Sequence, residues 1–367
     1  MHIEKIELQN FRNYKNLELE FSKNVNLILG KNAQGKTNLL EAVYLTAIGR
    51  SFRTSKDIDL VKFNENNSIV KVWAEKELNS TTVEISIKRK GEKSSEKYIK
   101  KDKKNVTRTS QLLKNILIVI FSPEDLKIVK DEPEKRRKFI DRELSQISPK
   151  YYNSLSNYKK SLLQRNTYLK EENLEPSIID IWDVQLSKYG AEVIFLREKF
   201  IEKLSEYSSK IHSGITGGKE NLDILYEPNV EIKQSLSEQE DFIYSELKNS
   251  FKTDSRNRNT SVGPHRDDIL FVVNDIDMRN FGSQGQQRTC ALSLKLAELN
   301  LIKEKTDEDA ILLLDDVMSE LDADRQEFLI DTMKNNQLFI TTTELDQNIK
   351  DKFDELKIFY IENGTLI

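Results

Sequence analysis

The segment Gly30–Thr37 constrains the fold of this chain more than any other, because its residues, GKNAQGKT, match the pattern of a phosphate-binding loop. That pattern requires a buried strand before it and a helix after it. Both are predicted here: VNLIL (25–29) is a short apolar run, and NLLEAVYLTAI (38–48) has apolar residues at helical spacing. The chain is therefore expected to contain an α/β domain that binds a nucleoside triphosphate.

The residue types in this loop suit the contacts expected of them. Gly30 and Gly35 let the backbone wrap closely, so that consecutive N–H groups and the helix N-terminus point at phosphate oxygens. Lys36 is expected across the β- and γ-phosphates of ATP, and the Thr37 hydroxyl is expected to bind Mg²⁺. The alternative is a glycine turn that caps an ordinary helix. The predicted ATP-binding residues of the loop are Gly30, Lys31, Asn32, Ala33, Gln34, Gly35, Lys36 and Thr37.

A second apolar run, ILLLDD (311–316), ends in two carboxylates. Asp315 is placed to hold Mg²⁺, directly or through water, and Asp316 is placed to activate the attacking water as a general base. Acidic residues also follow buried strands as helix caps. The pair becomes informative because a phosphate loop precedes it in the same chain, and we predict Asp316 and Lys36 as the catalytic residues.

The segment SQGQQRT (283–289) leads into an apolar helical pattern and resembles the signature of the ABC ATPases, usually LSGGQ. The resemblance implies that Ser283, Gly285 and Gln286 close over the γ-phosphate of ATP bound by an opposite subunit, so that ATP drives homodimer formation. SELD (319–322) likewise resembles the family's D-loop, which contacts the partner subunit. Taken alone, Ser283 is better explained as the N-cap of a helix, and Asp322 as part of a turn at a helix start.

Other parts of the family pattern match less completely. NFRNY (10–14) resembles the turn with which SMC-type ATPases touch nucleotide, and it predicts Arg12 as the contact, with a surface arginine as the alternative. TTT (341–343) stands where many ABC proteins carry a histidine that senses the γ-phosphate. That histidine is absent here, which leaves the role of Thr342 open. The usual residue at position 316 is Glu. Because Asp is one methylene shorter, two outcomes remain: a slow ATPase, or a DNA clamp with ATP as a structural ligand and negligible turnover.

The 367 residues are enough for two structural units. Strand patterns dominate up to residue 121, helical patterns continue to about 252, and strand character returns with DDILFVV (267–273). We therefore predict an ABC-type ATPase head of α/β class, formed by residues 1–121 and 253–367. A mainly helical lobe, residues 122–252, is inserted into it.

The insertion has about 130 residues. The corresponding insertion of transporter ATPases is usually smaller, and the coiled coil of SMC proteins is far longer. Four segments resemble those of the compact RecF family: GRSFRTSKDIDLV (49–61), FSPEDLKIVKDEPEKRRKFID (121–141), VGPHRDDI (262–269) and FGSQGQQRT (281–289). The resemblance implies ATP-gated binding of duplex and duplex–single-strand junction DNA, action with RecO and RecR, loading of RecA at gaps, and roles in replication restart and SOS induction. A transporter ATPase subunit is the alternative.

DNA contacts are expected only from local patches, because the net charge is −4. The segment Lys88–Arg108 has a local net charge of +7, which favours contact with phosphates without sequence specificity. The alternative is that these lysines form the solvated edge of a sheet, where their charge deters aggregation with other strands. KRRK (135–138) is a further candidate, with packing at a helix surface as its alternative. The predicted DNA contacts are Arg50, Arg53, Lys100, Lys101, Lys103 and Lys104.

Several classes of protein are disfavoured by composition. A single cysteine, Cys290, cannot form an internal disulfide, and with three histidines it makes a structural zinc site improbable. The start, MHIEKIELQN, lacks the pattern of a signal peptide. No apolar stretch approaches the roughly 18 residues of a membrane helix. We therefore expect a soluble cytoplasmic protein without a membrane partner.

Overall fold

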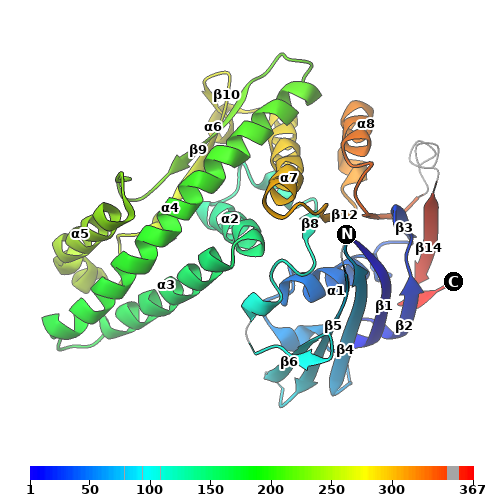
Figure 1. Cartoon of the computed structure of the whole chain (residues 1–367), viewed down its shortest axis with the longest axis horizontal. Helices are drawn as coiled ribbons and strands as arrows, with labels where there is room; N and C mark the ends of the chain where they lie inside the picture. Colours follow the sequence, from blue (N-terminus) through cyan, green and yellow to red (C-terminus); the bar gives the residue numbers. More distant parts are fainter. Residues whose placement is uncertain (78, 93, 108, 345–354) are drawn as a thin grey trace. The chain divides into compact units, whose positions relative to one another are not determined.

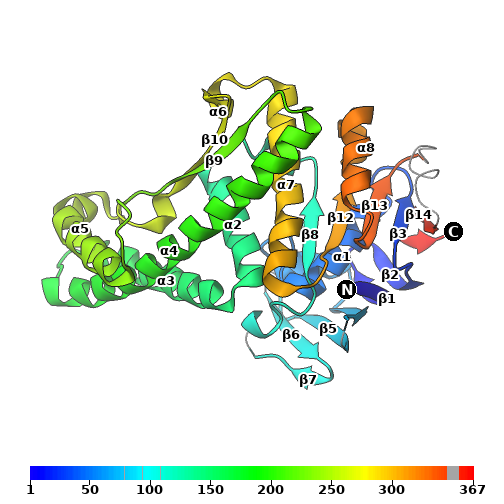
Figure 2. The same ribbon diagram turned by 45° about the horizontal axis from the view of Figure 1, so that its top comes forward.

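The computed structural model describes residues 1–77, 79–92, 94–107, 109–344 and 355–367. They form two units, which we call the head unit (Met1–Asp125 with Glu298–Ile367) and the helical unit (Leu126–Ala297) (Figure 1). Figure 2 shows the same ribbon from a second direction. Each unit is described below by itself.

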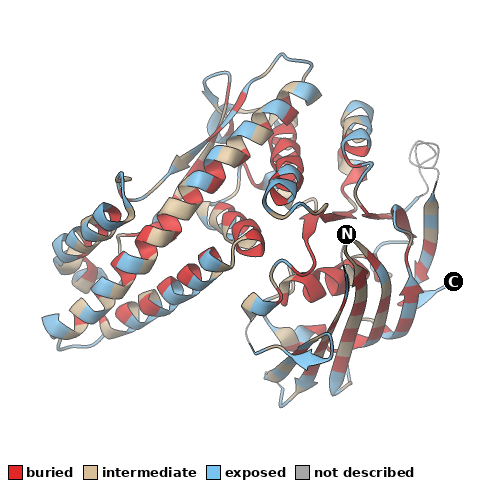
Figure 3. Ribbon diagram, viewed as in Figure 1, coloured by how far each residue is buried: buried red, intermediate tan, exposed pale blue. Residues whose placement is uncertain are grey.

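The first sheet of the head unit is antiparallel, with strands in the order β2-β1-β4-β5-β6-β7. Its alternating sequence has the expected effect, because every second residue of β4 and β5 is buried and the residues between them are more exposed (Figure 3). The strands are β1 (His2–Phe11), β2 (Tyr14–Glu20), β4 (Asn67–Glu75), β5 (Ser80–Arg89), β6 (Ser95–Lys101) and β7 (Lys104–Asn105).

The second sheet of the head unit has the order β15-β14-β3-β13-β12-β8, and all its pairs are parallel except β14 with β15. β3, β8 and β12 are buried along their whole length, which explains their continuous apolar runs. The strands are β3 (Val25–Leu29), β8 (Ile118–Phe121), β12 (Ile311–Asp315), β13 (Leu338–Thr342), β14 (Leu356–Glu362) and β15 (Thr365–Leu366).

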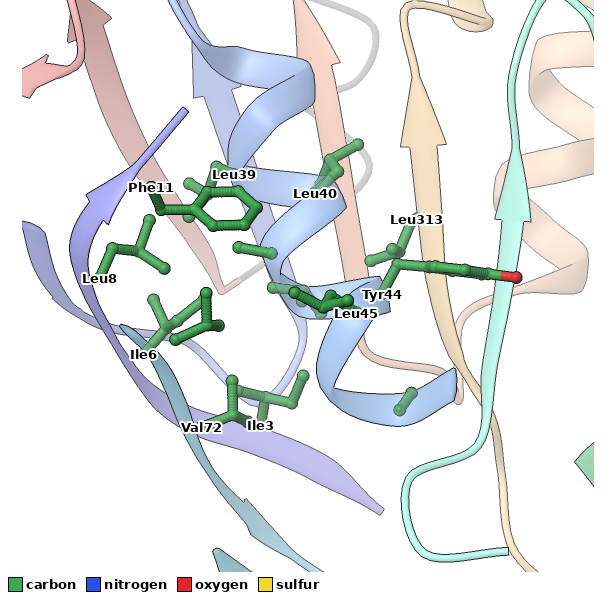
Figure 4. Packing of buried hydrophobic residues seen from close by; sticks show 14 of the residues in the cluster. Ile3, Ile6, Leu8, Phe11, Leu39, Leu40, Tyr44, Leu45, Val72 and Leu313 are labelled. Carbon is green, nitrogen blue, oxygen red and sulfur yellow. The ribbon is translucent and has the colours of Figure 1, made fainter. Parts of the chain in front are cut away.

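Helix α1 (Lys36–Ile48) contributes to a core cluster that contains residues of both sheets. Figure 4 shows its side chains beside Ile6 and Val72 of the first sheet and Leu313 of the second. A helix covered on several sides needs no polar face, and ten of its residues are buried. Among the described residues, the other helices wholly within the head unit are α8 (Ala323–Thr332) and the short 3₁₀ segments η1 (Asp57–Leu60), η2 (Thr109–Gln111) and η5 (Met318–Glu320).

The helical unit is built around the long helix α4, which packs against α3 and α5. Pro149 begins α3, where its fixed φ suits the helix and its missing N–H leaves no bond unmade. Buried Arg165 joins these three helices by ion pairs with Asp183 (Nε–Oδ1 2.8 Å) and Asp254 (Nη1–Oδ2 2.7 Å). The helices are α2 (Pro133–Ile147), α3 (Pro149–Tyr168), α4 (Pro176–Ile215), α5 (Leu236–Asn257), α6 (Met278–Phe281) and α7 (Gln284–Thr306), with the 3₁₀ segments η3 (Asp125–Lys127) at the unit's start and η4 (Pro264–Arg266). α7 continues past residue 297 into the head unit.

The second predicted boundary of the head, at residue 253, is wrong. β10 (Asp268–Val273), which forms most of DDILFVV, pairs with β9 (Leu222–Glu227) and with β11 (Ile276–Asp277). Residues 253–297 therefore belong to the helical unit, and the head unit resumes at Glu298. Alternation in a sequence identifies a half-buried strand but carries no information about which sheet the strand joins. The first boundary, predicted after residue 121, lies after residue 125.

None of the helices among the described residues is both long enough and apolar enough to cross a membrane.

Candidate nucleotide site

The predicted phosphate loop connects β3 to α1, as its pattern requires. Its glycines are required by neighbouring protein atoms. A Cβ at Gly30 would lie 2.4 Å from the carbonyl oxygen of Ile361, and one at Gly35 would lie 2.7 Å from Asn13 Nδ2. Gly35 also has a φ of 123°, in the region that favours glycine. The side chains of Lys31, Asn32 and Ala33 are exposed at the outer part of the loop.

Gln34 is held from two directions by segments far away in the sequence. Its carbonyl oxygen accepts hydrogen bonds from Asn13 Nδ2 (2.8 Å) and from the backbone N–H of Gly364 (3.0 Å). Its side-chain Oε1 accepts one from the N–H of Asn363 (2.7 Å). The hydroxyl of Tyr14 donates to the carbonyl of Gly35 (2.9 Å), and burial raises the pKa of this phenol, which keeps it a donor at neutral pH. We call Asn13, Tyr14, Asn363 and Gly364 the loop brace.

The Lys36 side chain crosses the loop and is 3% exposed. Its Nζ donates to the carbonyl of Gly30 (2.7 Å) and lies 3.9 Å from Asp316 Oδ1. Asp316 follows β12 with a φ of 52° and has a partly exposed side chain. The structure therefore brings the two predicted catalytic residues together at the loop.

Thr37 and Asp315 also meet, because the Thr37 hydroxyl donates to Asp315 Oδ1 (2.8 Å). Burial raises the pKa of Asp315, while hydrogen bonds from Thr37 and Thr341 lower it and the charge of Asp316 raises it further. A divalent cation beside this carboxylate would offset the cost of burying its charge. A hydroxyl and a carboxylate are the oxygen donors that Mg²⁺ prefers, so these residues fit the predicted metal site.

Thr341 was not predicted as a site residue, yet its side chain, and not that of its neighbour Thr342, contacts Asp315. Its hydroxyl donates to Asp315 Oδ1 (3.0 Å) and accepts from the N–H of Asp316 (2.8 Å). Thr342 instead donates to the carbonyl of Glu344 (3.1 Å). The register of β12 against β13 decides this, because Asp315 lies opposite Thr341.

Arg12 and Arg53 both reach α1. Arg12 forms a two-bond ion pair with Glu41, from Nε (2.8 Å) and Nη2 (2.7 Å), and Glu41 is fully buried. Arg53 Nη1 donates to Asn38 Oδ1 (2.7 Å), one residue beyond Thr37, and lies 3.5 Å from Glu41 Oε2. Both arginines therefore stand next to the phosphate-loop helix. The nucleotide contact of Arg12 and the DNA contact of Arg53 stay predictions.

The signature segment lies at the start of α7, in the helical unit. Ser283 Oγ accepts from the N–H of Gln286 (3.2 Å), and Gln286 Oε1 accepts from the N–H of Ser283 (3.1 Å). This reciprocal pair is a capping box, so the N-cap interpretation of Ser283 describes the geometry. Gly285 is the second residue of the helix. Asp322, in the segment that resembles the D-loop, likewise caps α8 through the N–H of Arg325 (3.0 Å).

The lysine-rich segment forms β6, a tight turn and the edge strand β7, which we call the lysine hairpin (residues 95–105). Asp102 and Lys103 have φ of 49° and 66°, as in a type I′ turn. Lys103 and Lys104 are exposed and Lys101 is half-buried, while Lys100 pairs with Glu84 (Nζ–Oε1 3.1 Å). Arg108, the end of the predicted basic segment, lies outside the described residues.

The other two basic candidates differ from the hairpin and from each other. Arg50 is exposed at the end of α1. In KRRK, Arg136 is buried and bonds Asp268 twice (2.6 and 2.7 Å), and Arg137 Nη1 donates to the carbonyl of Asp267 (2.6 Å). These arginines therefore serve the packing of the helical unit, which is the alternative that the sequence left open.

Comparison with known proteins agrees with this geometry. The family described as RecF/RecN/SMC N terminal domain matches residues 2–366. The DNA replication and repair protein RecF of Clostridium tetani is 43% identical over 369 residues, covering 100% of both chains. The protein of that name from Alkaliphilus oremlandii is 42% identical over 369 residues, with the same coverage.

Solved structures give the same result. The recombination mediator protein RecF-ATPrS in the RecFOR pathway superposes with a TM-score of 0.92 at 38% identity, covering 100% of this chain and 97% of that one. An Smc head domain from Pyrococcus yayanosii shares the fold, with a TM-score of 0.57 at 13% identity, covering 100% of this chain and 96% of that one. The predicted ABC-type ATPase head is thereby confirmed. The chain belongs to the RecF family of DNA replication and repair proteins, within the SMC-like ATPases.

Proposed function

We propose that the protein binds ATP with Mg²⁺ at the phosphate loop, hydrolyses it slowly and forms a homodimer while ATP is bound. The dimer holds duplex and duplex–single-strand junction DNA. It acts with RecO and RecR to promote loading of RecA at gaps, which supports replication restart and SOS induction. The observation that carries the proposal is the cluster of Lys36, Thr37, Asp315 and Asp316 around one loop.

In this proposal the cluster divides the work of phosphoryl transfer to water. Lys36 neutralises charge on the β- and γ-phosphates. Its hydrogen bond to the carbonyl of Gly30 already directs the ammonium across the loop. Thr37 and Asp315 hold Mg²⁺, which stabilises the phosphate charge. Asp316, 3.9 Å from Lys36 Nζ, takes the proton of the attacking water. The names of the solved RecF structures, which include ATP and ATPrS, support the choice of nucleotide.

A second candidate is a DNA clamp that binds ATP but turns it over negligibly. The short side chain at position 316 favours it, because a general base must reach the water within hydrogen-bond distance. Measuring phosphate release with and without duplex DNA separates the two candidates. DNA-stimulated release supports the ATPase, and ATP-dependent dimers without release support the clamp. Membership of the RecF family argues against the alternative of a transporter ATPase subunit.

The test of the proposal uses the two interpretations of Ser283. Ser283→Asp and Ser283→Asn both preserve an N-cap oxygen, but only the aspartate places a negative charge where the γ-phosphate of the partner would dock. Light scattering should show a dimer with ATP and Mg²⁺, and monomer with ADP, for the wild type and Ser283→Asn. Ser283→Asp should stay monomeric and still bind ATP. Equal dimerisation of both variants, or no ATP-dependent dimer at all, would refute the proposed dimer.

A further inference from the structure

A chain of side-chain hydrogen bonds in the helical unit reaches the signature segment from outside the motif. Gln286 Nε2 donates to Glu220 Oε1 (2.9 Å), and Glu220 Oε2 lies 3.1 Å from His212 Nε2. His212 Nδ1 lies 3.1 Å from Ser293 Oγ, which donates to the carbonyl of Thr289 (2.8 Å). We call Gln286, Glu220, His212 and Ser293 the signature relay. It begins and ends on α7, so it ties the first turns of that helix to the end of α4.

Glu220 is held in place by the turn that follows α4. Its N–H donates to Thr216 Oγ1 (3.4 Å), and Thr216 in turn donates to the carbonyl of His212 (2.9 Å). Gly217 and Gly218 have φ of 61° and 76°, which glycine adopts without strain. The turn therefore brings the carboxylate back over His212, and the carboxylate is available to Gln286 in a fixed position.

The hydrogens of the relay determine its direction. The single hydroxyl hydrogen of Ser293 is directed at Thr289, so His212 Nδ1 must be the donor to Ser293 Oγ. His212 Nε2 faces Glu220 Oε2, and the other carboxylate oxygen, Oε1, accepts from Gln286. The amide of Gln286 is thereby oriented, with its nitrogen toward Glu220 and its oxygen toward the N–H of Ser283.

We propose that Glu220 is a positioning residue for the signature, acting through Gln286. It keeps the capping box of Ser283 and Gln286 closed, so that the N–H groups at the start of α7 are held ready for the γ-phosphate of ATP on the partner subunit. The inference rests on the proposed ATP-driven dimer. It also changes the expected role of Gln286, whose side chain is used in shaping the segment.

Two substitutions of Glu220 separate a positioning role from a loss of fold. Glu220→Ala frees Gln286 and should weaken ATP-driven dimerisation about 10- to 100-fold. The reason is that a shift of about 1 Å in groups that must meet a ligand can reduce their effect by up to about 100-fold. Affinity of the monomer for ATP should not change, because the phosphate loop belongs to the head unit. The amide of Glu220→Gln can accept from Gln286 and donate to His212, so this variant should dimerise almost normally. Asp223→Ala, an exposed carboxylate nearby, is the matched control.

A mixing experiment tests whether Glu220 acts across the subunit interface. In the proposed dimer each site takes its phosphate loop from one subunit and its signature from the other. Glu220→Ala mixed with Lys36→Ala should therefore hydrolyse more ATP than the two variants do separately, because mixed dimers hold one complete site. Lys36→Ala mixed with Ser283→Asp is the reference.

Three outcomes of the mixing experiment decide the matter. Recovery in both mixtures supports the role of Glu220. Recovery with Ser283→Asp but not with Glu220→Ala would overturn that role and leave the proposed dimer standing. Where the wild type hydrolyses ATP, recovery in neither mixture would overturn both. Dimerisation of Glu220→Ala equal to that of the wild type would also reject the inference, whatever the mixtures do.

Discussion

The nucleotide site and the lysine hairpin both present cations in the head unit, but they hold them differently. Lys36 is 3% exposed and donates to the carbonyl of Gly30. Arg12 is bonded twice to buried Glu41. On the hairpin, Lys103 and Lys104 are exposed, and within the described residues neither forms an ion pair. The site has fixed its charges before any ligand arrives, and the hairpin has left the charges of Lys103 and Lys104 in water.

This difference determines what each region can recognise. A fixed charge with little water around it favours one geometry of phosphate and responds weakly to salt. A solvated lysine attracts any polyanion, and its contribution falls as salt rises. We therefore expect changes in the site to alter nucleotide chemistry and leave the salt dependence of DNA binding unaltered. Changes in the hairpin should do the reverse.

The largest effect is expected from Asp316→Asn, which keeps the shape of the side chain and removes the base. Turnover should fall about 10²- to 10⁴-fold, while ATP still binds and the dimer persists on DNA. Single-turnover phosphate release and dimer lifetime are the measurements. Asp324→Asn, an exposed carboxylate on α8, is the control. Normal hydrolysis by Asp316→Asn would assign the base elsewhere.

Lys36→Ala is expected to have the next largest effect. It removes a charged donor to the phosphates, a contact worth about 1.5–3 kcal/mol, so ATP affinity should fall about 10- to 100-fold. Titration calorimetry measures the affinity. The salt dependence of nucleotide-free DNA binding should stay the same, because Lys36 is directed into the loop. A change in that dependence would break the separation between site and hairpin.

The sequence predicts the loop side of this site better than its surroundings. The phosphate loop is contiguous, so its pattern identifies Lys36 and Thr37 without knowledge of the fold. The loop brace is not contiguous. Gly364 meets Gln34 because β14 pairs with β3 and carries the C-terminal hairpin to the loop, and Asn13 reaches Gln34 from the turn between β1 and β2. No local pattern reports that pairing.

Thr341 and Arg53 illustrate the same limit. Which of two adjacent threonines faces Asp315 depends on the register between β12 and β13, and shifting a strand by one residue turns each side chain to the opposite face. Arg53 looks like a free basic residue in the sequence. Its contact with Asn38 depends on the path of the chain after α1, which composition does not specify.

A smaller effect is expected from Asn13→Asp, which sharpens the role of the loop brace. The new carboxylate can still accept from Asn38, as Asn13 does (2.8 Å), but it cannot donate to the carbonyl of Gln34. One lost hydrogen bond is worth about 0.5–1.5 kcal/mol, so ATP affinity should fall about 2- to 10-fold. Unchanged affinity would mean that the bond from Gly364 is sufficient.

The smallest effect is expected at the hairpin, and it should appear in salt dependence before it appears in affinity. Each lost phosphate contact lowers the slope of log K against log salt by about 0.9 for duplex DNA, so Lys103→Gln with Lys104→Gln should lower it by about 1.8. Lys100 is left intact because Glu84 already pairs with it.

The matched control for that pair is Lys203→Gln with Lys210→Gln, which removes two lysines that both pair with Glu206. Fluorescence anisotropy over a range of salt concentrations gives the slopes, and ATP-driven dimerisation should be equal in both double variants. If the hairpin variant keeps the wild-type slope, its lysines are a solvated edge. Their role would then be to keep the edge strand β7 from pairing with other chains, because charged side chains there oppose such pairing.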